Sequence, residues 1–167
     1  MLKNFENGYL VAQGSTVAKM EKNDCVVRAF ANACDVTYES AHQVVKEVFG
    51  RKDKRGVTMF NFIMKQIKSI KFDQLGQLSL FDNDVIERNI QHLGDAPKLG
   101  GKLINKKYKH KKVAYTVKEF ARQYKTGNYI VAVKGHALAI CNGVIIDNPD
   151  KQTNGYRRVV ESAFKIS

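Results

Sequence analysis

The sequence lacks a long apolar run and a leader-like beginning, and these two absences exclude two classes of protein. No hydrophobic run approaches the roughly 20 residues that a bilayer-spanning helix needs. Residues 1–16, MLKNFENGYLVAQGST, mix polar and apolar residues too finely for a signal peptide. We therefore expect a protein of the cytoplasm that has no membrane partner.

Cysteine is scarce, and its number argues against a disulfide framework. There are three cysteines, Cys25, Cys34 and Cys141. An odd number without a signal peptide predicts free thiols. The chain contains no C-x-x-C pair, and its four histidines do not cluster at zinc-binding spacings. We expect no structural metal and no cofactor.

Proline is also rare, and no internal repeat interrupts the chain. The 167 residues are 44% hydrophobic, which is enough for one core. Most loop signals gather in the middle of the chain, where GDAPKLGGK opens a basic segment at about residues 94–113. We interpret that segment as an insertion within a single domain spanning residues 1–167.

Positive charge is in excess, with a formal net charge of +12. Such a charge attracts polyanions, including nucleic acids and acidic proteins. The densest run is KLINKKYKHKK, and its candidate contacts to such a partner are Lys106, Lys107, Lys109, Lys111 and Lys112. No recognition motif accompanies these lysines, so a solvated loop that keeps the protein in solution is the favoured interpretation.

Helical patterns dominate the first two thirds of the sequence. Asn23 or Asp24 is suited to cap a helix that runs to about Ala33, with Val26, Ala29 and Phe30 on one apolar face. Caps and apolar periodicity predict further helices at residues 38–50, 56–70, 83–94 and 116–127.

The pattern then changes from helix to strand. The run NYIVAVKGHALAICNGVIIDN, residues 128–148, is rich in β-branched residues and contains Asn142-Gly143, which predicts a hairpin with a type I′ turn. Residues 156–166 are expected to form one or two closing strands. Helices followed by an antiparallel sheet predict an α+β fold.

The predicted turn fixes a register, and the register brings two polar residues together. Cys141 should face Val144, and alternation along the strands then places His136 and Asp147 on one face. Asn148 is expected on the other face. A carboxylate beside an imidazole can orient and polarise it, although two such residues could also be solvated surface groups.

Cys25 favours the chemical interpretation because it begins a predicted helix. Unpaired N–H groups and the helix dipole lower the pKa of a thiol at that position, and the same N–H groups can hold an oxyanion. Cys34 and Cys141 have no such surroundings and are expected to be inert.

The residues that carry this chemistry resemble those of a known superfamily. Two segments, NDCVVRAFANACDVTYESAH and TVKEFARQYKTGNYIVAVKGHALAICNGVIIDN, resemble small papain-like cysteine peptidases of phages and bacterial genomes. MEKNDC is similar to the nucleophile segment of bacteriocin-processing peptidases. The resemblance implies a papain-like domain, in which the nucleophile helix packs on an antiparallel sheet. It also implies thiol-dependent cleavage of peptide or isopeptide bonds, and a phage origin, which would place the protein in the host cytoplasm.

One position departs from the superfamily pattern. A glutamine often stands six residues before the nucleophile and completes the oxyanion hole, but Lys19 occupies that position here. Asn23 or Gln13 is the amide side chain that could replace it, together with the N–H of Cys25.

Two hypotheses from different classes follow. In the first, the chain is a cysteine peptidase with Cys25 as nucleophile, His136 as base and then acid, and Asp147 as the residue that orients His136. The same triad could instead catalyse acyl transfer or deamidation. In the second, the chain is a non-catalytic phage protein that binds nucleic acid or an acidic host protein through its basic surface.

Overall fold

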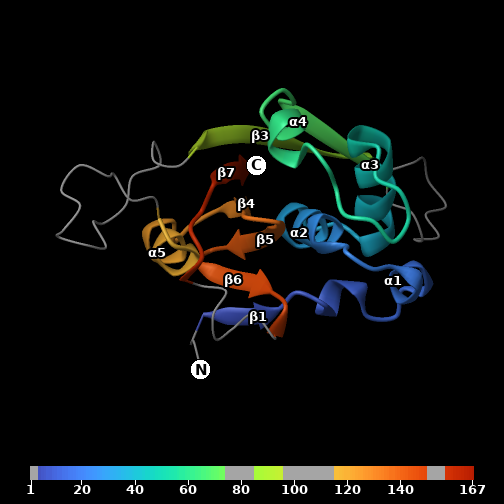
Figure 1. Cartoon of the computed structure of the whole chain (residues 1–167), viewed down its shortest axis with the longest axis horizontal. Coiled ribbons are helices and arrows are strands. Elements are labelled where there is room, and N and C mark those ends of the chain that lie inside the picture. Colours follow the sequence, from blue (N-terminus) through green and yellow to red (C-terminus); the bar gives the residue numbers. More distant parts are fainter. Residues whose placement is uncertain (1–3, 74–84, 96–114, 150–156) are drawn as a thin grey trace.

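The computed structural model describes residues 4–73, 85–95, 115–149 and 157–167. Within these ranges, seven strands form one mixed sheet in the order β1-β6-β5-β4-β7-β3-β2 (Figure 1). The strands are β1 (Phe5–Asn7), β2 (Ser69–Asp73), β3 (Val85–Asp95), β4 (Asn128–Val133), β5 (His136–Cys141), β6 (Val144–Asp147) and β7 (Ser162–Ile166).

Five α-helices and a short 3-10 helix accompany the sheet in the described residues. They are η1 (Leu10–Ala12), α1 (Thr16–Met20), α2 (Cys25–Cys34), α3 (Tyr38–Phe49), α4 (Phe60–Met64) and α5 (Val117–Gln123). The α+β class predicted from the sequence is therefore correct.

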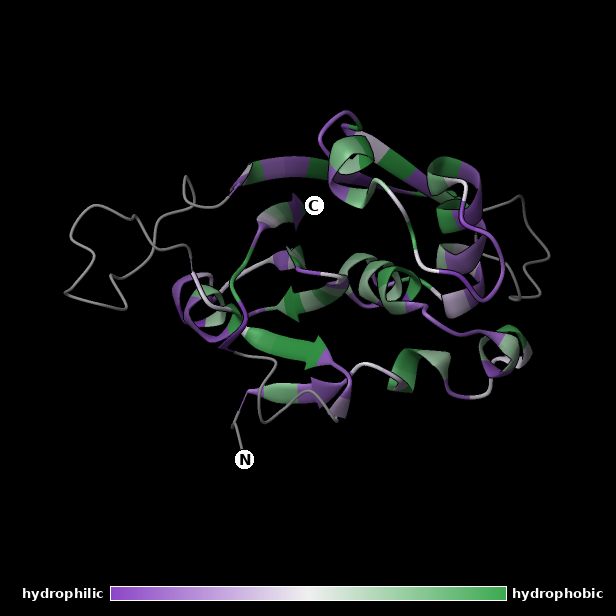
Figure 2. Ribbon diagram, in the orientation of Figure 1, coloured by the Kyte–Doolittle hydropathy of each residue, from purple (hydrophilic) through white to green (hydrophobic). Residues whose placement is uncertain are grey.

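Helix α2 is the central helix, and it is apolar on nearly every side. Its buried residues include Val27, Phe30 and Ala33, none of which is exposed to solvent. The helix lies against β5 and β4, with α3 on its other flank (Figure 1). Apolar residues are concentrated in α2, β5 and β6, whereas the loop after α3 is polar (Figure 2). A helix enclosed in this way holds its first residue firmly against the sheet.

The β5–β6 hairpin has the predicted turn and register. Asn142 and Gly143 both have positive φ, at 50° and 76°, as a type I′ turn requires. Cys141 pairs with Val144, as expected. Because the turn residues alone fix this register, it could be predicted without tertiary information.

The helix expected at residues 83–94 is wrong, because most of that stretch forms β3. Strand β3 pairs with β2 on one side and β7 on the other. Ile86, Arg88 and Ile90 alternate with more exposed residues along it. The residues of this stretch have only a modest helix propensity. Hydrogen bonds to the two neighbouring strands outweigh that propensity, so the stretch forms a strand. The strand extends to Asp95, so the first two residues of the predicted loop segment belong to the sheet.

The helix expected at residues 56–70 is also wrong in its extent. It is reduced to the single turn of α4, and β2 follows at Ser69. Ile70 and Phe72 are buried on alternate positions of β2, which is the periodicity of a strand.

A further correction concerns the order and direction of the strands. Strands β1, β2 and β3 precede the last helix, so the helices do not all come first. The sheet is also mixed, because β1 pairs with β6 in parallel. Strand β1 is only three residues long and carries no signal of its own.

The basic segment lies largely outside the described residues. All five candidate lysines, Lys106, Lys107, Lys109, Lys111 and Lys112, fall in the undescribed range 96–114.

Among the helices of the described ranges, none has the length and apolar character needed to cross a membrane.

Candidate active site

Cys25 is the first residue of α2, and the side chain of the residue before it does not cap the helix. Asp24 occupies the predicted N-cap position but makes no capping hydrogen bond. Its carboxylate instead accepts from Nε of Arg28 at 3.0 Å and from the hydroxyl of Tyr38 at 2.7 Å. The N–H groups of the first turn, including that of Cys25, are therefore not occupied by this carboxylate.

His136 and Asp147 lie at the open end of the β5–β6 hairpin, where His136 begins β5 and Asp147 ends β6. Nε2 of His136 lies 2.7 Å from Oδ1 of Asp147, as the register predicted. The Asp147 side chain is only 4% exposed, and the N–H of Asn148 donates to the same oxygen at 2.7 Å. The backbone of Asp147 is held as well, because its carbonyl accepts from the N–H of Gly8 at 2.8 Å.

The thiol of Cys25 and the imidazole of His136 shift each other's ionisation. Burial by itself would raise the pKa of Cys25, but interaction with His136, the N–H of Ala137 and the charge of Arg28 outweigh it and lower that pKa. Burial would lower the pKa of His136, but Asp147 and Cys25 raise it to about 9. Since Nε2 is engaged by Asp147, Nδ1 is the ring nitrogen left for the thiol. The arrangement favours a thiolate–imidazolium pair.

These side chains line a cleft of about 860 Å³. Cys25, His136 and Asn148 lie on its wall. Residues of the loop before α4 and of α4 itself form another part of the lining, and two of them are unusually exposed for apolar side chains. Met59 is 64% exposed and Phe62 is 59% exposed. A solvent-accessible cleft with an apolar margin is suited to an extended, partly apolar ligand.

The candidate oxyanion donors differ in how the structure places them. Cys25 and Asn23 both line the cleft, whereas Lys19 and Gln13 are exposed and do not. Asn23 has a left-handed backbone, with φ of 53°, and its Nδ2 donates to the carbonyl of Lys54 at 3.2 Å. The side-chain amide of Asn23 is thus already engaged, and the backbone N–H of Cys25 is the better-placed donor of the two.

The sequence interpretation missed two residues of the site, Arg28 and Asn148. Arg28 is a buried arginine on α2, one turn after Cys25. Asn148 contacts Arg28 on the α2 side of the sheet, which is the face expected for it, and it lines the same cleft as His136. A charged residue within a largely apolar helix was the signal that could have identified Arg28.

The other two thiols lie in surroundings that suppress ionisation. Burial raises the pKa of Cys34 to about 12 and that of Cys141 to about 11. Neither cysteine lines the cleft. These surroundings support the inert role predicted for the two residues, which stays a prediction.

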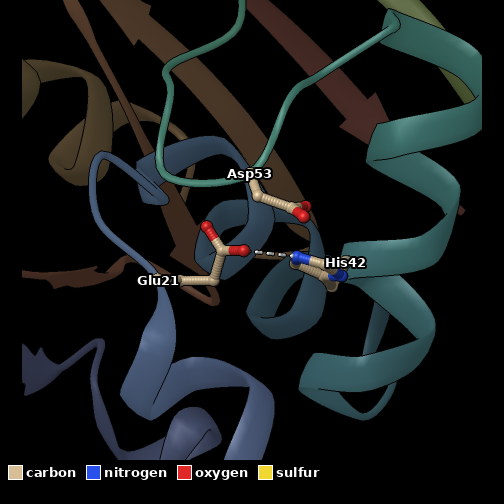
Figure 3. A group of neighbouring side chains, drawn as sticks. All are labelled: Glu21, His42 and Asp53. Atoms are coloured by element: carbon tan, nitrogen blue, oxygen red, sulfur yellow. Dashed lines mark hydrogen bonds and ion pairs between the residues drawn. The ribbon is translucent and has the colours of Figure 1, made fainter.

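A second cluster of titratable groups lies beside the loop that leads into Cys25. Glu21, His42 and Asp53 present ligand atoms within 4.8 Å of one another (Figure 3). Both carboxylates already have cationic partners, however. Glu21 lies 2.6 Å from Nη2 of Arg51, and Asp53 lies 2.8 Å from Nζ of Lys46. We interpret the cluster as an ion-pair network rather than a metal centre, because these cations oppose a further positive charge.

The network ties two loops together. Glu21 also accepts from Nε2 of His42 at 2.9 Å and from the N–H of Lys54 at 2.9 Å. Arg51 additionally donates to the carbonyl of Lys22 at 3.1 Å. The segment before Cys25 is therefore anchored to the loop after α3, which fixes how the chain enters α2.

No known protein family, curated protein or solved structure matches this chain in comparisons of its sequence and fold.

Proposed function

We propose that the chain is a papain-like cysteine peptidase that hydrolyses a peptide or isopeptide bond with Cys25, His136 and Asp147. One observation carries the proposal. A thiol at an open helix start interacts with an imidazole, and a buried carboxylate holds that imidazole at 2.7 Å. A nucleophile, a base and a residue that orients the base are the parts that acyl transfer through a thioester requires.

In the first step, the Cys25 thiolate attacks the carbonyl carbon of the substrate. A carbon–sulfur bond forms, and the carbonyl electron pair moves to oxygen, where the N–H of Cys25 can stabilise it. The intermediate then collapses. The carbon–nitrogen bond breaks, and the departing amine takes the proton of the His136 imidazolium, leaving an acyl thioester on Cys25.

In the second step, water replaces the amine. Neutral His136 accepts a proton from the attacking water, a second tetrahedral intermediate forms, and the carbon–sulfur bond breaks. The carboxylic acid leaves, and the proton on His136 restores the ion pair with Cys25. Asp147 keeps the imidazole in one orientation through both steps and stabilises its charged form.

Alkylation with iodoacetamide tests whether Cys25 has the expected reactivity. We expect peptide mapping to find the label on Cys25 well before Cys34 or Cys141, because only the first has a lowered pKa. Equal labelling of all three cysteines in the folded protein would contradict the proposal.

Turnover can be tested without knowing the natural substrate. A complex mixture of peptides, incubated with the protein in isotopically labelled water, should acquire new carboxyl termini that contain the label. Cys25→Ser should remove these termini while leaving the unfolding temperature nearly unchanged, because the replacement is close in size. New amide bonds that carry no label, in place of labelled carboxyl termini, would indicate acyl transfer by the same triad.

A further inference from the structure

Arg28 is a buried cation on the nucleophile helix, and it makes contacts in three directions. Its side chain is 7% exposed. Nε donates to Oδ1 of Asp24 at 3.0 Å, and Nη1 donates to Oδ1 of Asn148. The guanidinium also lies over the ring of Tyr9, 4.0 Å from its centroid. Arg28 thus joins the start of α2 to the residue that follows β6.

The contact with Asn148 leads directly to the proposed triad. The N–H of Asn148 donates to Oδ1 of Asp147 at 2.7 Å, and that same oxygen lies 2.7 Å from Nε2 of His136. His136 in turn interacts with the thiol of Cys25, one turn before Arg28 on α2. The contacts therefore form a closed ring that begins and ends on one helix.

We propose that Arg28 is a positioning residue, which holds Asn148 and through it sets the alignment of Asp147 and His136 with the thiol on α2. The inference rests on the proposed function of Cys25, His136 and Asp147. It adds a residue that touches none of the reacting atoms and that, besides the direct effect of its charge on Cys25, acts through the end of β6.

The shape of the guanidinium explains why an arginine stands here. Its planar fork presents donors in fixed directions, so one side chain can hold Asp24 and Asn148 together. A lysine at this position would keep the charge but would present a single compact ammonium group. The hydroxyl of Tyr38 holds the second oxygen of Asp24 at 2.7 Å, so the anchor for Arg28 is itself fixed.

Stability alone is a weak reason for this arrangement. Burying an ion pair carries a desolvation cost that can exceed the attraction between the charges, and apolar residues of similar volume often stabilise a fold better. The gain from Arg28 is one of geometry, since it connects two elements that bear separate parts of the triad.

The test measures how the alkylation rate of Cys25 depends on pH, and it requires no substrate. Two variants break the proposed link, Arg28→Lys and Asn148→Ala. The matched control is Arg88→Lys, because Nε of Arg88 donates to the carbonyl of Cys34 at 2.9 Å at the other end of α2. Thermal unfolding of each variant reports whether the fold is retained.

We expect both variants to move the midpoint of the alkylation profile upward by about one pH unit, which is a tenfold smaller thiolate fraction below the midpoint. The control should leave the midpoint unchanged. Because the two substitutions interrupt one link, the double variant should shift the midpoint no further than the larger single shift.

Three results would overturn the inference: an unchanged midpoint in both variants, a shift in the control as large as theirs, or additive shifts in the double variant. If Arg28→Lys fails to fold, Asn148→Ala decides alone, since it leaves the Arg28–Asp24 pair in place. A wild-type midpoint equal to that of a free cysteine, about 8.5, would contradict the proposed function itself.

Discussion

At the scale of single residues, hydrogen bonds fix both the side chain and the backbone of Asp147. Its Oδ1 lies 2.7 Å from Nε2 of His136 and also accepts a hydrogen bond from the N–H of Asn148. The backbone carbonyl of Asp147 accepts from the N–H of Gly8. These contacts fix the carboxylate so that it can hold only one orientation of the imidazole. Asp147 is therefore in direct contact with the proposed base, whereas Asn148 acts one contact further away.

This difference predicts a ranking of two variants. Asp147→Ala should lower kcat on the order of 10²-fold, because the proposed base loses the partner that orients it. Asn148→Ala should lower kcat by less, since Asp147 and His136 remain. Comparing kcat for the two variants on one peptide substrate checks this. A larger loss for Asn148→Ala would mean that Asp147 is not the third member of the triad.

Asp147→Ala should also change the pH dependence. His136 has its pKa raised to about 9, partly by Asp147, so the imidazolium persists until the pH rises past that value. Without Asp147 the pKa should fall toward the ordinary value, and the alkaline limb of the activity profile should move to lower pH. If the alkaline limb does not move, a group other than His136 determines it.

Glu21 gives a second prediction at the residue scale, and it concerns stability. Burial would raise its pKa, but hydrogen bonds from Arg51, the N–H of Lys54 and His42 lower it from 4.5 to about 2. The unfolded chain therefore binds more protons than the folded chain between these values. Stability from Glu21 is present above about pH 4.5 and is lost as the pH falls toward 2, by up to about 3 kcal/mol.

Glu21→Gln should flatten this acid dependence in urea unfolding measured across that pH range. The variant should also be less stable near neutral pH, because Arg51, whose side chain is fully buried, loses its charged partner. Glu47→Gln, on the exposed face of α3, is the control and should keep the wild-type dependence. If Glu21→Gln leaves the acid dependence of stability unaltered, a group other than Glu21 causes that dependence.

At the scale of elements, the β5–β6 hairpin carries two thirds of the proposed triad, and its turn depends on Gly143. The residue has φ of 76°, and a Cβ there would meet the carbonyl oxygen of Ala121 at 3.2 Å. Gly143→Ala should therefore cost about 1–2 kcal/mol, from the left-handed conformation alone. Thermal unfolding should detect the loss.

Gly56→Ala is a suitable control for this stability measurement. Gly56 has no positive φ, and a Cβ at that position would have nothing within 4 Å. Equal unfolding temperatures for the two variants would show that the turn does not require glycine.

At the scale of the whole molecule, α2 and α3 share a core with one face of the sheet, and α5 packs in a second cluster on the other face. Phe30 of α2 is fully buried, and its ring lies 5.6 Å from that of Phe49 on α3 and 6.3 Å from that of Phe72 on β2. Phe30→Ala should cost about 3–5 kcal/mol, because it opens a cavity where these elements meet. Phe62→Ala should leave stability nearly unchanged in urea unfolding, since its side chain is largely exposed. Similar losses in both variants would contradict this description of the core.

The sequence by itself determined the features whose causes are local. Thr116 and Glu119 form the predicted capping box at the start of α5, and Gly50 ends α3 in a left-handed conformation. Asn142-Gly143 fixed the turn and hence the alignment of His136 with Asp147. In each case the few residues that make the structure are also neighbours in the chain, so no distant partner was needed.

Tertiary structure decided the features that depend on distant partners. Strand β3 exists because β2 and β7 flank it, and β1 because β6 accepts it in parallel. The Asp24 carboxylate accepts from Tyr38 as well as from Arg28 instead of capping its helix, and Asn148 contacts Arg28, which lies 120 residues earlier in the chain. Pairing between strands and buried polar contacts join residues far apart in the chain, and local propensity contains no information about which of those residues meet.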